Sequence, residues 1–154
     1  MTIEERLAEM GLELPPARAW ANSNRKGAVC SGNLLFVSGH TPTEFPEGYR
    51  IEGAVGASVS TTDARHAAQG CALAILRSIV DEIGSLDRVT RVVKLLGFVK
   101  SAPGFHDQFS VIDGASDVFA GLWGEAGVHA RSAIGVFELP RGQCVEVEGV
   151  FEFR

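Results

Sequence analysis

Hydrophobic and polar positions alternate along the C-terminal part of the chain. Over residues 145–154, apolar residues and a glycine share one face, while glutamates dominate the other. This period of two predicts a strand with one buried and one more polar face. A second strand is expected over residues 130–138, which are small or apolar apart from Arg131 and a terminal glutamate. A turn-like segment at residues 139–143 separates the two strands.

Two other segments have apolar residues at spacings of three and four, the pattern of a helix packed on one side. The first starts with capping residues at 60–63 and ends at Gly84, a glycine suited to a helix C-terminus. The second runs from about residue 105 to 122, and Phe109 belongs to its expected buried stripe. A short amphipathic helix is predicted for residues 2–10.

The remaining patterns complete a single sheet. A strand rich in Val and Leu is expected at residues 88–100, and a Gly-Asn turn joins residues 28–31 to a strand at 34–38. The order is β-β-(β)-α-β-α-β-β, with the bracketed short strand near Ile51. This order predicts an α+β fold in which two helices cover one face of one sheet. A chain of 154 residues forms one domain.

The composition is that of a soluble globular protein, with 45% hydrophobic and 21% charged residues. A net charge of −5 without any basic run argues against nucleic acid as a partner. Three cysteines without metal-ligand spacing indicate a reduced, cytoplasmic setting rather than a disulfide framework. No stretch has the signature of a secretory signal or a membrane span, so no membrane partner is expected.

Four short motifs occur in a recognisable order: Gly-Asn-Leu-Leu-Phe-Val-Ser-Gly at 32–39, Ala-Arg-Ser at 130–132, Leu-Pro at 139–140 and Val-Glu-Val-Glu at 145–148. Together they resemble the RidA/YjgF family, also labelled endoribonuclease L-PSP, over about residues 18–154. The resemblance implies the chorismate-mutase-like fold and a homotrimer with sites between subunits. Residues 1–16 then form a helical extension and proline linker on a core of residues 17–154.

Arg131 and Glu146 carry the implied chemistry. On pattern alone, Arg131 is either an ion-pair partner or an anion receptor, and Glu146 resembles the exposed glutamates beside it. The family resemblance implies an enamine/imine deaminase that hydrolyses 2-enamino and 2-imino acids to 2-keto acids and ammonia. Arg131 would then bind the substrate carboxylate through two parallel hydrogen bonds, and Glu146 would be the catalytic residue that activates water.

Three further residues are candidates for substrate binding. Gly39 permits backbone geometry that other residues resist and could present a main-chain group to a ligand, as could the adjacent Ser38. Ala133 stands where the family archetype has a cysteine. Two more departures concern the pocket: Arg25 falls near the position of the family's tyrosine, and Asp113 replaces a common asparagine. An arginine at position 25 would favour a more acidic ligand than a simple enamine acid.

The distance between Arg131 and Glu146 poses a problem if the last two strands form a simple hairpin. With Glu138 opposite Cys144, the two charges would lie on the order of 16 Å apart in one subunit. A shared site then requires either a different strand pairing or a residue from a neighbouring chain.

No motif points to a metal or a cofactor. The four histidines are scattered without ligand spacing, and no phosphate-binding glycine loop or nucleophile elbow is present, so neither a metal nor a cofactor is expected. Two alternatives to the deaminase remain. One is a non-catalytic protein that binds small carboxylic acids. The other is the endoribonuclease of the older family label.

Overall fold

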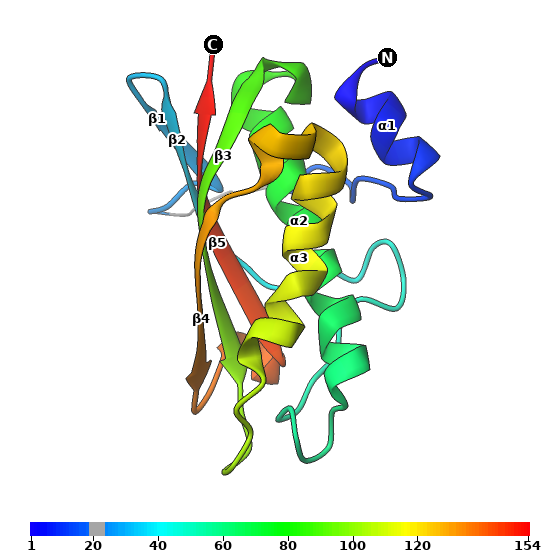
Figure 1. Cartoon of the computed structure of the whole chain (residues 1–154). Coiled ribbons are helices and arrows are strands. Elements are labelled where there is room, and N and C mark those ends of the chain that lie inside the picture. The colour runs from blue at the N-terminus through cyan, green and yellow to red at the C-terminus, as the bar shows by residue number, and fades with distance from the viewer. Residues whose placement is uncertain (19–23) are drawn as a thin grey trace.

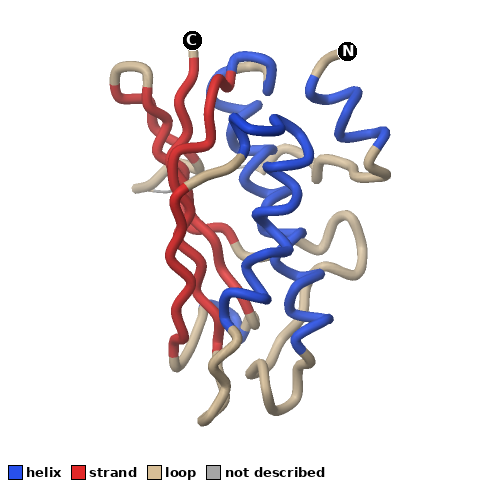
Figure 2. The backbone as a smooth tube through the Cα atoms, viewed as in Figure 1, coloured by secondary structure: helices blue, strands red, loops and turns tan. Residues whose placement is uncertain are grey.

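The alternating segments build one mixed sheet. In the computed structural model, which describes residues 1–18 and 24–154, five strands are ordered β1-β2-β5-β3-β4 (Figures 1 and 2). Neighbouring strands are antiparallel except β3 and β4, which are parallel. The strands are β1 (Ala28–Ser31), β2 (Leu34–His40), β3 (Val89–Lys100), β4 (Ala130–Val136) and β5 (Val145–Phe153).

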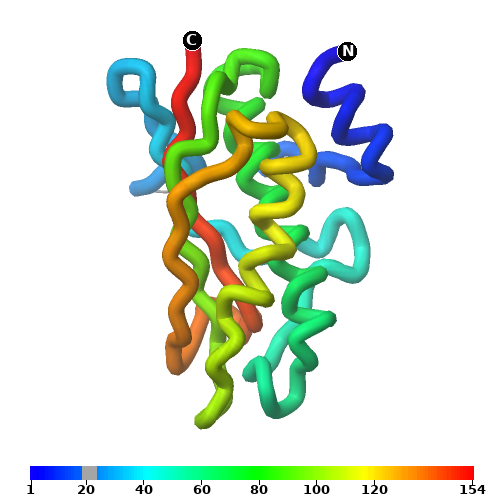
Figure 3. Tube along the Cα trace, viewed as in Figure 1, coloured from blue at the N-terminus to red at the C-terminus, as the bar shows by residue number. Residues whose placement is uncertain are grey.

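The C-terminal strand β5 occupies the middle of the sheet, between β2 and β3 (Figure 3). Its alternation is confirmed: Val145, Val147 and Phe151 are fully buried on the side of the helices. Phe151 meets Phe119 of a covering helix edge to face, with 5.4 Å between ring centroids. Removal of this apolar face from water is the main force that holds the sheet against its helices.

The simple hairpin between the last two strands is wrong. Strand β3 lies between β4 and β5, and it pairs with both along most of its length. Residues 137–144, which include the short 3-10 helix Pro140–Gly142, therefore cross over one strand instead of making a tight turn. The expected strand near Ile51 is reduced to isolated bridges at Glu52 and Val55.

The helices all lie on one side of the sheet (Figure 2). Helix α2 (Thr61–Ile83) is capped by Ser60, whose hydroxyl accepts from the Asp63 amide, and ends at the left-handed Gly84. Helix α3 (Gln108–Trp123) begins about one turn later than predicted. For that reason Phe109 sits in its first turn, 55% exposed rather than in the buried stripe. No helix in the described part of the chain is long and apolar enough to cross a membrane.

Gly114 explains how closely the two long helices approach. In isolation a glycine weakens a helix, but a Cβ at this position would lie 2.0 Å from the carbonyl oxygen of Arg65 on α2. The absence of a side chain therefore permits the α2–α3 contact, and this helical layer is part of the α+β architecture that the pattern predicted.

The N-terminal helix α1 (Ile3–Glu9) docks on the end of the helical layer (Figure 1). A capping box joins Thr2 and Glu5, and the Ile3 amide donates to the Asp87 carboxylate at 2.8 Å. The Arg6 guanidinium donates to the Leu122 carbonyl at 2.6 Å, and Leu7 is buried. These contacts fix the direction in which the following proline-rich segment leaves the helix.

The face of the sheet away from the helices, here called the open face, carries apolar side chains. Phe36 and Ile134 are 48% and 45% exposed, and Val29 is 51% exposed. The registers Val29–Phe36–Val150 and Phe98–Ile134 align these residues in rows across neighbouring strands. Contiguous apolar surface of this kind is typical of an interface with another protein surface.

Candidate active site

The centre of the candidate site is an irregularity between β2 and β5. The pairing passes from Val37–Gly149 to His40–Val147, so β2 contains one extra residue, a β-bulge. Bulges re-aim side chains and are common beside active sites. Here the bulge places the Gly39 backbone against the Glu146 carboxylate, and a Cβ at Gly39 would lie 2.5 Å from Glu146 Oε1. The structure thus brings together two of the predicted site residues.

His40 holds the bulge in place from the buried side. Its side chain is 2% exposed, with Nδ1 at 2.5 Å from the Ser38 carbonyl and Nε2 at 2.7 Å from the Ser78 hydroxyl. Burial, and secondarily the charge of Arg18, lower the pKa of His40, so the ring is neutral near pH 7. A neutral ring matches these contacts if Nδ1–H donates to the carbonyl and Nε2 accepts from Ser78. His40 therefore acts as a structural support for the bulge.

Ser38 has a structural role in this arrangement. Its hydroxyl donates to the Lys26 carbonyl at 2.6 Å, and its amide donates to the Gly27 carbonyl. Ser38 does not line the pocket described next. It ties β2 to the residues before β1, and the main chain of Gly39 is what faces Glu146.

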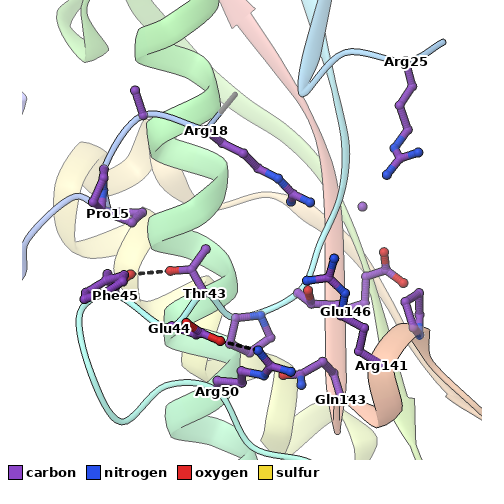
Figure 4. Close-up of a pocket in the computed structure, with 16 residues that line it drawn as sticks. Pro15, Arg18, Arg25, Thr43, Glu44, Phe45, Arg50, Arg141, Gln143 and Glu146 are labelled. Atoms are coloured by element: carbon purple, nitrogen blue, oxygen red, sulfur yellow. Dashed lines mark hydrogen bonds and ion pairs between the residues drawn. The ribbon is translucent and has the colours of Figure 1, made fainter. Parts of the chain in front are cut away.

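Glu146 and Gly39 open into a cavity of about 720 Å³, within the size range of small-molecule sites (Figure 4). Glu146 is partly buried, and its pKa is raised by burial and by the charge of Glu148. A carboxyl group with a raised pKa can exchange a proton closer to neutral pH than an ordinary glutamate. The lining residues are Pro15, Pro16, Ala17, Arg18, Arg25, Gly39, Thr41, Pro42, Thr43, Glu44, Phe45, Arg50, Pro140, Arg141, Gln143 and Glu146.

Arginines dominate the charged lining. Figure 4 shows Arg18 and Arg25 reaching from different segments toward the space beside Glu146. Partial burial lowers the pKa of Arg18, and the nearby charges of Arg141 and Arg25 lower it further. Arg50 is paired with Glu44 at 2.5 Å and with Glu52 at 3.1 Å.

Gln143 forms part of the wall of the same cavity. It is 2% exposed, yet neither its Nε2 nor its Oε1 has a hydrogen-bond partner in the described chain. Buried amides are nearly always paired, so Gln143 is an exception to this rule in the wall of the cavity.

Arg131 lies elsewhere in the same chain. It pairs in register with the buried Leu95 and points to the helical side of the sheet, whereas Glu146 pairs with Phe98 on the open face. Two strand spacings, about 10 Å, also separate β4 from β5. Ala133 follows Arg131 on the helical side and packs against the core. The structure therefore does not bring Arg131 or Ala133 to Gly39 and Glu146 within one chain.

The Arg131 guanidinium contacts helix α3. Its Nη1 donates to Asp113 Oδ1 at 2.7 Å and to Ser116 Oγ at 3.0 Å, and its Nη2 donates to the Phe109 carbonyl at 3.3 Å. Of the roughly five N–H donors of an arginine, these bonds leave Nε–H and one Nη2–H, the side-on fork that binds a carboxylate. Both readings of this arginine are thus compatible: it forms an ion pair, and it keeps donors for an anion.

Of the residues that line the cavity, the sequence motifs indicate only Gly39, Arg25 and Glu146 as site candidates. Arg18, Arg141 and Gln143 are among those that they do not indicate: Arg18 follows a proline pair, and the other two lie in the segment predicted to be a turn. The clearest signal in the sequence is the position of Arg141 between a proline and a glycine. In the structure Arg141 adopts a left-handed φ of 56°, which is uncommon for a non-glycine residue. Across residues 1–18 and 24–154, no group of three or more His, Cys, Asp or Glu residues is arranged to hold a metal ion.

The fold and the site define a class: α+β proteins with a single mixed sheet covered by helices, of the chorismate-mutase-like type. The model of the family described as "YjgF/chorismate mutase-like, putative endoribonuclease" matches residues 4–145. The chain therefore belongs to the YjgF/RidA family.

Several relatives extend this result. Protein TCP17 of Trypanosoma cruzi is 44% identical over 147 residues, which cover 95% of this chain and 91% of the relative. A crystal structure of an Agrobacterium tumefaciens protein of unknown function is 41% identical with a TM-score of 0.90, and covers 99% of this chain and 92% of its own. A putative endoribonuclease from Shewanella oneidensis is 27% identical with a TM-score of 0.91, covering 99% and 100%.

Proposed function

We propose that the protein is an enamine/imine deaminase that converts 2-imino and 2-enamino acids to 2-keto acids and ammonia. The observation that carries the proposal is the contact of the partly buried Glu146 carboxylate with the Gly39 backbone at the mouth of a ligand-sized cavity. Family membership supports the same chemistry, because these two residues occupy the positions that the motif resemblance assigns to the site.

The reaction needs a base and an anion anchor. An enamine acid first takes a proton from solvent at C3 to become the iminium ion. Glu146, as a carboxylate, then accepts a proton from water while the oxygen attacks C2 and the C=N π electrons move to nitrogen, which gives a neutral carbinolamine. Glu146 returns its proton to the nitrogen, the C2–N bond breaks to release ammonia, and the C2 hydroxyl loses its proton to water and becomes the ketone. The raised pKa of Glu146 suits a residue that must take up and return one proton.

Arg131 would serve a site in a neighbouring subunit. It lies on the edge strand β4, with the two donors of its side-on fork still available. The exposed apolar rows of the open face supply a surface on which copies of the chain can associate. A cyclic homotrimer would then combine Gly39 and Glu146 of one subunit with Arg131 of the next, which removes the distance problem found within one chain.

The test is the hydrolysis of 2-aminoacrylate generated in situ, with wild type compared with Arg131→Ala. The variant should lose turnover because the carboxylate loses its bidentate anchor. Arg91→Ala removes an arginine from the neighbouring strand β3 and serves as the matched control. Full activity of Arg131→Ala would overturn the proposal.

Two observations favour a second candidate, a non-catalytic protein that binds small carboxylic acids. Asp113 already neutralises part of the Arg131 charge, and Ala133 replaces the cysteine of the family archetype. Stoichiometric binding of a keto acid without any turnover would identify this function. The endoribonuclease named for relatives ranks third, because no histidine is among the described residues that line the cavity. RNA cleavage lost in Glu146→Gln would promote it.

A further inference from the structure

A chain of hydrogen bonds extends from Arg131 beyond its first partners. Arg131 Nη1 donates to Ser116 Oγ at 3.0 Å, and Ser116 Oγ lies 3.0 Å from Nε2 of His129. His129 Nδ1 in turn lies 2.6 Å from the carbonyl oxygen of Gly127. Ser116 is on α3, Arg131 is on β4, and the other two residues lie in the connection between these elements. None of the four lines the cavity beside Glu146.

The direction of each bond follows from the chemistry of its two ends. A carbonyl oxygen only accepts, so His129 Nδ1 carries a proton and Nε2 of the neutral ring is an acceptor. A guanidinium only donates, so the Ser116 oxygen accepts from Arg131 and its own proton goes to His129 Nε2. Burial lowers the pKa of His129, the Gly127 carbonyl opposes this, and the charge of Arg131 adds to the lowering. The ring is therefore neutral near pH 7, as this arrangement requires.

The fold fixes the position of the His129 ring. Gly127 packs so closely on α3 that a Cβ there would lie 2.1 Å from the Phe119 carbonyl oxygen, so the backbone that His129 contacts is held against the helix. The ring also meets Phe119 edge to face, with 6.3 Å between centroids and an interplanar angle of 85°. His129 is thus a fixed acceptor, and a fixed acceptor decides where the Ser116 proton points.

Without this acceptor the Ser116 hydroxyl would have other places to donate. A serine in a helix can turn its hydroxyl toward the carbonyl one turn earlier, here that of Ile112. Its lone pair would then no longer be aimed at Arg131. Because Arg131 Nη1 uses its two protons on Ser116 and Asp113, loss of the serine bond would leave the plane of the guanidinium less fixed.

From this geometry we propose that His129 is a positioning residue: acting through Ser116, it holds Arg131 with Nε–H and the second Nη2–H directed at an incoming carboxylate. The inference rests on the proposed function in one respect, because the carboxylate is taken to be that of the substrate in a neighbouring subunit. His129 does not touch the substrate in this arrangement. Its loss should therefore raise KM for imine hydrolysis and leave kcat nearly unchanged.

NMR of the isotope-labelled full chain tests the positioning without any ligand. His129→Phe keeps an aromatic ring but removes the acceptor, and rotation about the Arg131 Nε–Cζ bond should become about 2- to 10-fold faster, the effect of one weakened hydrogen bond. His129→Gln offers Oε1 to the Ser116 hydroxyl and should restore most of the slow rotation. His66→Phe makes the same exchange on α2 and is the matched control. Thermal unfolding shows whether each variant is folded, and Ser116→Ala carries the same expectation if His129→Phe does not fold.

A double-mutant cycle tests whether His129 acts through Ser116. Calorimetry measures the affinity for pyruvate, the keto acid formed from 2-aminoacrylate. His129→Phe and Ser116→Ala should each weaken binding by about 2- to 10-fold. The double variant should bind pyruvate within about 2-fold of the weaker single variant, because both substitutions break the same chain of bonds.

The outcomes separate this inference from the proposed function. Unchanged rotation of Arg131 in His129→Phe, or losses of affinity that multiply in the double variant, would overturn the inference even if 2-aminoacrylate is hydrolysed. Faster rotation that His129→Gln reverses, in a protein that neither binds pyruvate nor hydrolyses imines, would support the positioning role and refute the deaminase.

Discussion

Two arginine-containing regions of this molecule differ in how their charge is compensated. Arg131 lies on the edge strand against helix α3, where Asp113, Ser116 and a main-chain carbonyl accept from it. Arg18, Arg25 and Arg141 line one cavity, where the charges of Arg141 and Arg25 contribute to the lowered pKa of Arg18. The first arrangement holds a guanidinium in one orientation, and the second concentrates positive charge. We infer that the fixed orientation of Arg131 suits the binding of a substrate carboxylate, while the positive charge in the cavity favours anionic ligands.

The largest effect is expected for the base itself. Glu146→Gln should lower kcat for imine hydrolysis by about 10²- to 10⁴-fold, the usual contribution of a general base, with a small change in KM. Glu152→Gln is the matched control, because Glu152 is on the same face of β5 and its carboxylate accepts from Asn33 Nδ2 at 2.8 Å, away from the cavity lining. Steady-state kinetics would check this prediction, and equal losses in both variants would show that charge on β5, rather than the position of Glu146, matters.

Gly39→Ala should have the next largest effect. The new methyl group would meet the end of the Glu146 side chain rather than backbone, so the carboxylate moves while the fold survives. A displacement of about 1 Å in a catalytic group can cost 10²-fold in rate. Ser38→Ala, beside it, should retain most activity because the Ser38 hydroxyl donates to the Lys26 carbonyl and Ser38 is not among the residues that line the cavity. A Gly39→Ala enzyme with wild-type kcat would contradict the role given to the bulge.

Asp113→Asn sharpens the contrast between the two regions. It removes the negative charge at 2.7 Å from Arg131 Nη1, so the guanidinium should bind a substrate carboxylate more strongly. The pair is partly exposed, and the expected decrease in KM is only about 2- to 5-fold. Asp117→Asn, which alters the Arg65 pair on the same helix, is the control. An unchanged or higher KM would mean that Asp113 matters more for holding Arg131 in position than for reducing its attraction to the substrate carboxylate.

The smallest effect is a pH dependence of stability. Because burial raises the pKa of Glu146, the folded protein holds this proton more tightly than the unfolded chain. Ionisation therefore removes stability as the pH rises from the ordinary glutamate pKa through the raised folded value. Denaturant unfolding should show this loss in wild type but not in Glu146→Gln. Identical pH profiles would place Glu146 in a more water-like environment. Activity should change in the opposite direction and rise with pH over this range, because the ionised carboxylate of Glu146 is the active base.

Local patterns could predict the elements but not their arrangement. The alternation of β5 and the capped stripe of α2 follow from periodicity, and both are confirmed. The place of β3 between β4 and β5 could not be read in this way, because alternation identifies a buried face and not a neighbouring strand. The predicted burial of Phe109 is wrong because the residue lies in the first turn of α3, where too few neighbouring side chains surround it.

The site was predictable only where a motif covers it. Gly39 and Glu146 come from motifs far apart in the chain, and their contact is found in the structure. Arg18, Arg141 and Gln143 lie in irregular segments that meet only in the folded chain, so neither spacing nor propensity indicates them. Arg131 shows the converse: the motif identifies the residue, but the fold of one chain does not bring it to Glu146. The proposed site therefore requires a second subunit.

Subunit complementation tests the central claim most directly. Arg131→Ala and Glu146→Gln should each be inactive alone. When the two are co-expressed at equal amounts, a cyclic trimer that shares its sites should have about a quarter of sites with both native residues. We predict that the mixed protein regains roughly that fraction of wild-type turnover. A mixture that stays inactive, although mass spectrometry shows mixed assemblies, would contradict a site built from Arg131 of one subunit and Glu146 of another.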